Sequence, residues 1–184
     1  MELIKELKQS KIIKYVFIVL VGTVLLAISA KIKIPFYPVP MTMQTLVVLF
    51  LGVTLGWKLG VATVALYLFE GIIGLPVFSN SPEKGVGIIY FTGPTMGYLI
   101  GFIFTVYFAG SFKFSKNLFI RFLQLLFSLS FIYILGIFWL GTLIGWEKPL
   151  FKLGMQPFLL AELFKVLIIL FSLSKLKKLN QYLQ

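Results

Sequence analysis

The chain contains no cysteine, no histidine and no aspartate. Without cysteine it can form no disulfide, no thiol nucleophile and no thiolate metal site. Without histidine and aspartate it lacks the usual general bases, the catalytic triads and most ligands for transition metals. All six acidic residues are glutamates, which leaves few side chains that could carry out catalysis. We therefore expect that the protein is not an enzyme and that it holds neither a metal ion nor a cofactor.

Charge is also scarce, because only 12% of the residues are charged and 59% are hydrophobic. Soluble domains average about 25% charged and about 45–50% apolar residues. A water-soluble fold of 184 residues could not bury this much apolar surface. The composition therefore predicts one transmembrane domain over residues 1–184, in the cell membrane. The net charge of +11 does not indicate a nucleic-acid partner. The lysines fall between apolar segments, as do the basic residues that set the orientation of membrane helices.

Six apolar segments approach or reach the roughly 17–25 residues that a membrane-spanning helix needs. They cover residues 15–30, 41–57, 59–75, 94–110, 118–143 and 157–174. The sequence thus predicts an all-α membrane protein with six transmembrane helices. An even number of spans places both termini on one side of the membrane. Eleven of the 17 Lys and Arg residues fall on that side and five on the other. This bias predicts that both termini are cytoplasmic.

Residues 1–14 are polar and basic, and they favour a short cytoplasmic helix on the membrane surface. A cleavable signal peptide is the competing interpretation, because the small residues of Ala27–Ala30 end the first apolar run. The length of that run and the proline-rich sequence after it favour a membrane span.

The first outer loop, residues 31–40, contains Pro35, Pro38 and Pro40. Proline excludes helix and favours an extended path. An ordered extended loop at the membrane face could form the wall or lid of a cavity. The same prolines could instead make a rigid connector, and the sequence leaves both interpretations open.

Two ionisable residues lie inside the last span, where an unpaired charge costs several kcal/mol. Glu162 and Lys165 are three residues apart and share one helical face. With Pro157 at the first turn, Glu162 lies about 7.5 Å below the outer end of the helix. Its carboxylate could accept hydrogen bonds from a ligand, while the lysine balances its charge or holds an acidic ligand group. The alternative is an internal ion pair with no ligand.

Further site candidates are polar, aromatic or glycine residues near the outer ends of the spans. They are Gln44, Glu70, Asn80, Gly93, Thr95 and Tyr98. The amides offer both donors and acceptors, the glutamate could cap the cavity or be structural, and the tyrosine could line an apolar wall. The Gly-Pro-Thr sequence at 93–95 predicts free backbone N–H groups at a helix N-terminus, where a carboxylate could dock. Glycines at every fourth position, as at Gly97 and Gly101, favour close helix packing.

Four sequence blocks carry a resemblance to a known family. They are IPFYPVPMTMQTLVVLFLG, LYLFEGIIGLPVF, GPTMGYLIGF and PFLLAELFK, in this order along most of the chain. They resemble the successive signatures of the BioY family, the S components of biotin transporters of the energy-coupling-factor (ECF) type. The resemblance implies a six-helix S-component bundle with an outward-facing biotin site and no ATPase of its own. It also implies a partner module, in which a transmembrane T component carries two ABC-type ATPases.

The resemblance also assigns roles to individual residues. Glu162 stands where the family usually has Asp, and Lys165 matches the family's Lys, so both would meet the polar head of biotin. Asn80 resembles a further polar contact. Small residues on the first helix of the family contact the T component. The nearest matches here are Gly22, Thr23 and Ala27.

Three other functions stay open at this stage. The chain could be an S component for a different vitamin. It could be a small secondary transporter in which Glu162 carries a proton, although the neighbouring Lys165 disfavours this. It could also be a structural membrane subunit without a ligand.

Overall fold

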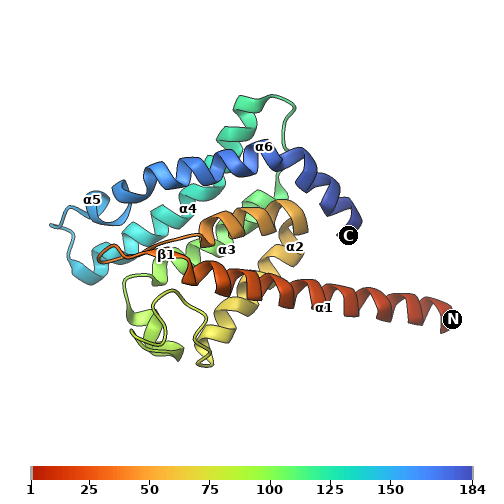
Figure 1. Ribbon diagram of the computed structural model, residues 1–184, viewed down its shortest axis with the longest axis horizontal. Helices are drawn as coiled ribbons and strands as arrows, with labels where there is room; N and C mark the ends of the chain where they lie inside the picture. The colour runs from red at the N-terminus through yellow and green to blue at the C-terminus, as the bar shows by residue number, and fades with distance from the viewer. Residues whose placement is uncertain (1, 184) are drawn as a thin grey trace.

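A computed structural model describes residues 2–183, with side chains for residues 11–180. The chain forms a helical bundle with one short β-hairpin, which confirms the predicted all-α fold (Figure 1). The elements are α1 (Glu2–Lys31), β1 (Lys33–Ile34), β2 (Met41–Thr42), α2 (Gln44–Ile72), the 3-10 helix η1 (Gly87–Thr92), α3 (Met96–Ser111), α4 (Leu118–Ile144), α5 (Leu150–Gly154), the 3-10 helix η2 (Gln156–Phe158) and α6 (Leu159–Leu183).

The bundle is organised around α2, which packs against α1, α3 and α6, while α3 packs against α4. Buried aliphatic and aromatic side chains such as Val48, Tyr67 and Val106 fill the space between these helices. Large apolar side chains such as Phe17 on α1 and Phe171 on α6 point outward and are exposed. Only lipid can cover such a surface at low free energy.

Four helical segments among the described residues are long and apolar enough to cross a membrane. They are Lys11–Lys31, Gln44–Ile72, Leu118–Ile144 and Leu150–Asn180. α3 is a shorter apolar helix. The protein is therefore a multi-pass membrane protein, as its composition predicts.

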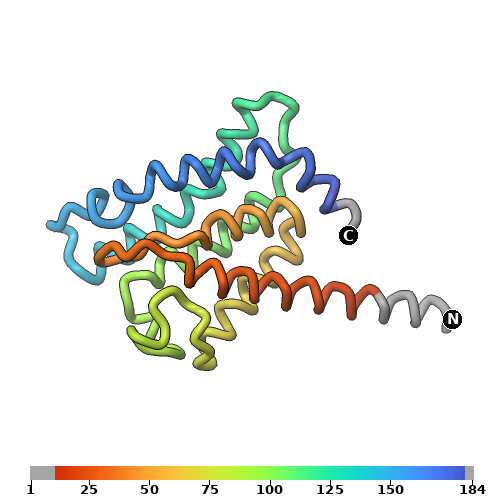
Figure 2. The backbone as a smooth tube through the Cα atoms, in the orientation of Figure 1, coloured from red at the N-terminus to blue at the C-terminus, as the bar shows by residue number. Residues whose placement is uncertain are grey.

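The second and third predicted spans, residues 41–57 and 59–75, are joined in α2 by a break at Gly56 (φ 71°, ψ 173°). This conformation is open almost only to glycine. Figure 2 shows the backbone turning back at the break, so that α2 is a helical hairpin without a connecting loop. The break falls at the junction predicted between these two spans, and α2 continues directly after it without a separate loop.

α1 is continuous over Glu2–Lys31, so the described part of the basic N-terminal segment extends the first span as one helix, and its location at the cytoplasmic membrane surface stays a prediction. Residue 1 and the side chains of residues 2–10 lie outside the described part of the chain. The first turns of α1 and the last turns of α6 lie at the same end of the bundle (Figure 1). That arrangement agrees with an even number of crossings, and the cytoplasmic location of this end stays a prediction.

The glycines of α3 bring this helix into direct contact with α4. A Cβ atom on Gly97 would lie 2.3 Å from the carbonyl oxygen of Leu135, and one on Gly101 would lie 2.5 Å from the Cα of Ile132. This confirms the packing role predicted for these two residues. α3 begins only at Met96, so Gly93 precedes the helix and takes no part in this contact.

We predict that Gly101→Ala lowers the free energy of unfolding by about 1–3 kcal/mol, because the added methyl group forces α3 and α4 apart. Denaturant titration of the detergent-solubilised protein measures this change. Thr142→Ala, at an exposed position on α4, is the matched control and should change stability by less than about 0.5 kcal/mol. If Gly101→Ala were as stable as Thr142→Ala, the close contact between α3 and α4 would be contradicted.

Candidate functional site

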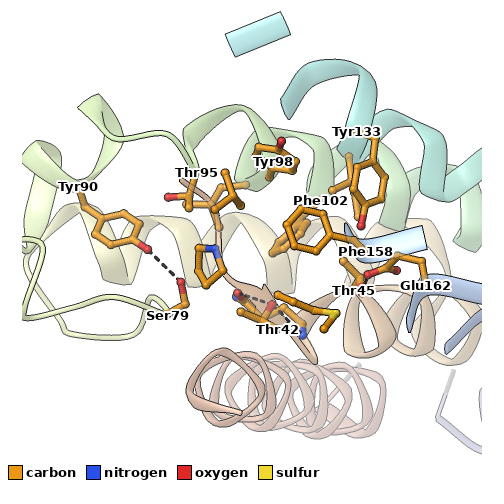
Figure 3. A pocket seen from close by; sticks show the side chains of 16 residues that line it. Thr42, Thr45, Ser79, Tyr90, Thr95, Tyr98, Phe102, Tyr133, Phe158 and Glu162 are labelled. Carbon is orange, nitrogen blue, oxygen red and sulfur yellow. Dashed lines mark hydrogen bonds between the residues drawn. The ribbon is translucent and has the colours of Figure 1, made fainter. Parts of the chain in front are cut away.

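One cavity lies at the end of the bundle where α2 and α6 begin. Sixteen side chains line it, from the hairpin region, α2, α3, α4, α6 and the segments between them (Figure 3). Val39 and Pro40, in the proline-rich connection between β1 and β2, form part of its wall. β1 and β2 pair antiparallel, with Lys33 opposite Thr42, which holds this connection in place. Of the two interpretations of the first outer loop, the structure supports the cavity wall.

A buried ion pair forms one end of the cavity. The Nζ of Lys165 lies 2.8 Å from the Oε1 of Glu162, and each residue is only 4% exposed. The ammonium group also donates to the carbonyl oxygen of Thr42 at 2.6 Å and to the Oγ1 of Thr45 at 2.9 Å. All three ammonium hydrogens therefore have acceptors inside the protein.

Thr45 completes this network from α2. Its hydroxyl donates to the Oε1 of Glu162 at 2.9 Å while accepting from Lys165. The Oε1 atom thus accepts two hydrogen bonds, whereas the Oε2 atom is buried and has no hydrogen-bond partner among the described residues. Glu162 lines the cavity, and the hydroxyl of Tyr133 points toward its carboxylate (Figure 3). Among the described residues, this end of the cavity therefore presents one carboxylate oxygen, with the Tyr133 hydroxyl facing it, and no free cation.

Hydroxyl groups line the opposite end of the cavity. The Oγ of Ser79 and the hydroxyl of Tyr90 lie 3.2 Å apart (Figure 3). Behind them, the Nζ of Lys33 donates to the carbonyl oxygen of Ser79 at 2.6 Å and to the Oδ1 of Asn80 at 3.1 Å. This end therefore combines two hydroxyls with a nearby cation.

The segment that carries these hydroxyls is anchored by Phe78, which is 1% exposed. Its ring packs on Gly71 of α2, stacks on Tyr90 at 4.7 Å and meets Tyr67 edge-to-face at 5.4 Å. The Nζ of Lys31 donates to the carbonyl oxygen of Phe78 at 2.8 Å. These contacts order the long link between α2 and α3.

Aromatic and aliphatic side chains form the walls between the two polar ends. Phe102 on α3 and Phe158 in η2 both line the cavity (Figure 3). Tyr98 contributes its ring, because its hydroxyl donates to the carbonyl oxygen of Gly154 at 2.8 Å. Such an apolar middle with polar ends is typical of sites for small organic ligands.

Six of the residues that the sequence predicts for the site lie at this cavity. Gln44, Thr95, Tyr98 and Glu162 line the cavity. Lys165 and Asn80 lie behind lining residues, because the Lys165 ammonium group donates to Glu162 and the backbone N–H of Asn80 donates to the hydroxyl of Tyr90.

Two candidates lie outside the lining of this cavity. Glu70 is half-buried on α2. The amide of Gly93 is not free for a ligand, since it donates to the carbonyl oxygen of Tyr90 at 3.2 Å. The carbonyl oxygen of Gly93 accepts from the Trp139 indole at 2.9 Å.

Residues of the site that the sequence did not single out include Thr45, Ser79 and Tyr133. A signal existed for Thr45, because Thr42 and Thr45 are spaced by three residues beside Gln44 at the start of a span. Tyr133 sits in a long apolar run with nothing to distinguish it from the aromatic residues that face lipid.

The residues predicted to contact a partner subunit face inward. Gly22 and Thr23 are buried, and a Cβ on Gly22 would lie 2.5 Å from the Cγ2 of Thr63 on α2. Ala27 is half-buried. This face of α1 therefore packs within the bundle and presents no open surface at Gly22 or Thr23.

The cavity is narrow in this conformation, with a volume of about 50 Å³. Sites for drug-sized ligands have volumes of roughly 300–1,000 Å³. A vitamin-sized ligand can therefore enter only when the lining elements move apart.

The fold and the site define a class, namely small helical membrane proteins that enclose a polar ligand site near one membrane face. The chain belongs to the BioY family, whose family model matches residues 4–182.

Individual relatives agree with this assignment. The chain is 37% identical to the biotin transporter BioY of Thermotoga maritima, over 86% of this chain and 92% of that protein. It is 35% identical to the probable biotin transporter BioY of Pyrococcus horikoshii, over 83% of this chain and 89% of that protein. Its structure resembles the crystal structure of the S-component for biotin from an ECF-type ABC transporter, with a TM-score of 0.76, 26% identity and coverage of 92% and 93% of the two chains.

We predict that Lys165→Met alone lowers the free energy of unfolding by about 3–5 kcal/mol, because it leaves the Glu162 carboxylate buried without a counter-charge. The double variant Glu162→Gln/Lys165→Met removes both charges and should recover most of this loss. Denaturant titration without ligand measures both values. Lys152→Met, at an exposed position, is the control; a loss as small as the control's would contradict the buried pair.

Proposed function

We propose that this chain is the biotin-binding S component of an ECF-type transporter in the plasma membrane. The function is transport, in which a ligand is bound and released without making or breaking a covalent bond. Membership of the BioY family and the relatives named as biotin transporters support the proposal. The observation that carries it is the buried, unpartnered Oε2 of Glu162 at the end of an apolar cavity.

The chemistry of this end selects a hydrogen-bond donor. The Oε2 of Glu162 can only accept, and all hydrogens of Lys165 are already engaged. A ligand carboxylate would meet a like charge here and no free cation. The ureido ring of biotin offers neutral N–H donors, and charge-assisted hydrogen bonds to a carboxylate are roughly twice as strong as neutral ones.

The opposite end of the cavity suits the carboxylate tail of biotin. Ser79 and Tyr90 are hydrogen-bonded to each other, which leaves one of their two hydroxyl hydrogens for a ligand. The ammonium group of Lys33 lies behind Ser79 and also 3.9 Å from the Oε2 of Glu83. The rings of Phe102 and Phe158 would contact the sulfur-containing ring and the methylene chain between the two polar ends. In this orientation the ligand lies along the cavity with its ureido ring at α6.

The energy for transport must come from a partner in this proposal. The sequence contains no GxxxxGK[ST] phosphate-binding motif, so the chain shows no nucleotide site of its own. A transmembrane T component with two ABC-type ATPases would supply ATP hydrolysis. The exposed apolar face of α1, which includes Val24 and Ile28, is available for contact with such a T component.

We predict that the purified protein binds biotin and that Glu162→Gln weakens binding at least tenfold, or about 1.4 kcal/mol. The substitution keeps the shape of the side chain but removes the charge that the ureido N–H groups would meet. Isothermal titration calorimetry measures the affinity. Glu147→Gln, on an exposed loop, is the matched control and should bind as the unaltered protein does.

The same titration separates the alternative functions. Binding of thiamin or riboflavin in place of biotin would assign the chain to another vitamin. Biotin uptake into vesicles that follows a proton gradient, with no ATPase present, would favour the secondary transporter. If the titration detected no heat of binding with any of these ligands, the result would favour a structural membrane subunit without a ligand.

The proposed orientation of biotin makes a separate prediction. Lys33→Met should weaken binding of biotin about tenfold, because the carboxylate loses its nearest cation. The same variant should bind biotin methyl ester, which has no carboxylate, as tightly as the unaltered protein binds it. Lys84→Met, at an exposed position between α2 and η1, is the control. Equal weakening for both ligands would place the carboxylate elsewhere.

A further inference from the structure

A second, larger hollow lies at the opposite end of the bundle. This inner groove is bordered by α1, the break in α2, the end of α3 and the last turns of α6, and it has a volume of about 940 Å³. Its lining residue Lys177 is 15 residues beyond Glu162 along α6, or about 22 Å away. The inner groove is therefore separate from the proposed biotin site.

Three lysines from three different elements line the inner groove, and none of its lining residues is acidic. They are Lys58 after the break in α2, Lys113 after α3 and Lys177 on α6. Among the described residues, the Nζ of Lys177 donates a long hydrogen bond, of 3.4 Å, to the carbonyl oxygen of Phe114 and lies 5.2 Å from the centre of its ring. An anion in this groove would be attracted by all three ammonium groups.

The position of the inner groove matches the level of lipid headgroups. Trp57 is exposed and lies 5.7 Å edge-to-face from Tyr107, and Trp and Tyr gather at membrane interfaces. Apolar residues such as Val53 and Leu59 line the same groove beside the lysines. A ligand that fits both parts has an anionic head and an apolar body.

We infer that the inner groove binds the headgroup of an anionic phospholipid, such as phosphatidylglycerol. The phosphate oxygens accept hydrogen bonds from Lys58, Lys113 and Lys177, while the glycerol and the first acyl carbons lie against the apolar lining. Basic pockets between transmembrane helices bind acidic lipids in this way. This site does not depend on the identity of the transported ligand.

The test uses the full chain in nanodiscs made from equal parts of phosphatidylcholine and phosphatidylglycerol. Native mass spectrometry then measures the ratio of the two lipids that stay bound. We expect phosphatidylglycerol to dominate on the unaltered protein, and Lys58→Gln/Lys113→Gln/Lys177→Gln to lower the ratio at least about tenfold. The charge-keeping variant Lys58→Arg/Lys113→Arg/Lys177→Arg should retain the lipid.

The matched control is Lys84→Gln/Lys148→Gln/Lys152→Gln, which removes the same charge from exposed positions outside the groove. An equal drop in the control overturns the proposal, because it shows a general effect of net charge. An unchanged ratio in the groove variant also overturns it, and loss of T-component binding by that variant would then make the groove a protein interface. Displacement of the lipid by soluble glycerol phosphate would reassign the site to free phosphates.

Unchanged melting temperatures establish that the variants are folded. Should the triple glutamine variant not fold, Lys58→Gln alone changes one exposed side chain and should lower the ratio about twofold. No change with this single variant would overturn the proposal as well.

Discussion

The structure depends on one buried ion pair, between Glu162 and Lys165. A charge taken out of water at this depth is tolerable only when its hydrogen-bonding capacity is satisfied. Thr45 and the carbonyl of Thr42 supply the missing partners, and in doing so they join α6 to the start of α2 and to the hairpin. The network that makes the charges tolerable thus also closes one end of the cavity.

The asymmetry of this network gives the site its chemistry. One carboxylate oxygen and the whole ammonium group are satisfied internally, which leaves a single acceptor at the cavity. A symmetric pair with both oxygens engaged would be a purely structural feature. The two ends of the bundle then carry different chemistry, with an acceptor and hydroxyls around the enclosed cavity and three lysines, with no acidic residue among the described lining, around the open inner groove.

The features that could be predicted from the sequence are those set by local spacing. Glu162 and Lys165 share a face because they are three apart, and Gly97 and Gly101 meet α4 because they are four apart. The break at Gly56 lies where the apolar segments 41–57 and 59–75 are predicted to separate, but its positive φ could not be predicted, since a glycine within a long apolar stretch equally favours close helix packing. Tyr133 and Ser79 reach the cavity only through the packing of distant elements, so no local pattern identifies them.

The helical hairpin formed by α2 also bears on the surrounding bilayer. Its second arm, residues 57–72, and α3 are each 16 residues and about 24 Å long, whereas the hydrocarbon core is about 30 Å thick. Phe69 and Phe104 on these two helices are exposed, while α4 on another side of the bundle is 27 residues long. The bilayer beside the short helices must therefore become thinner, which costs fractions of a kcal/mol per Å of mismatch. A protein whose helices are too short on one side only can lower this deformation energy by tilting in the membrane.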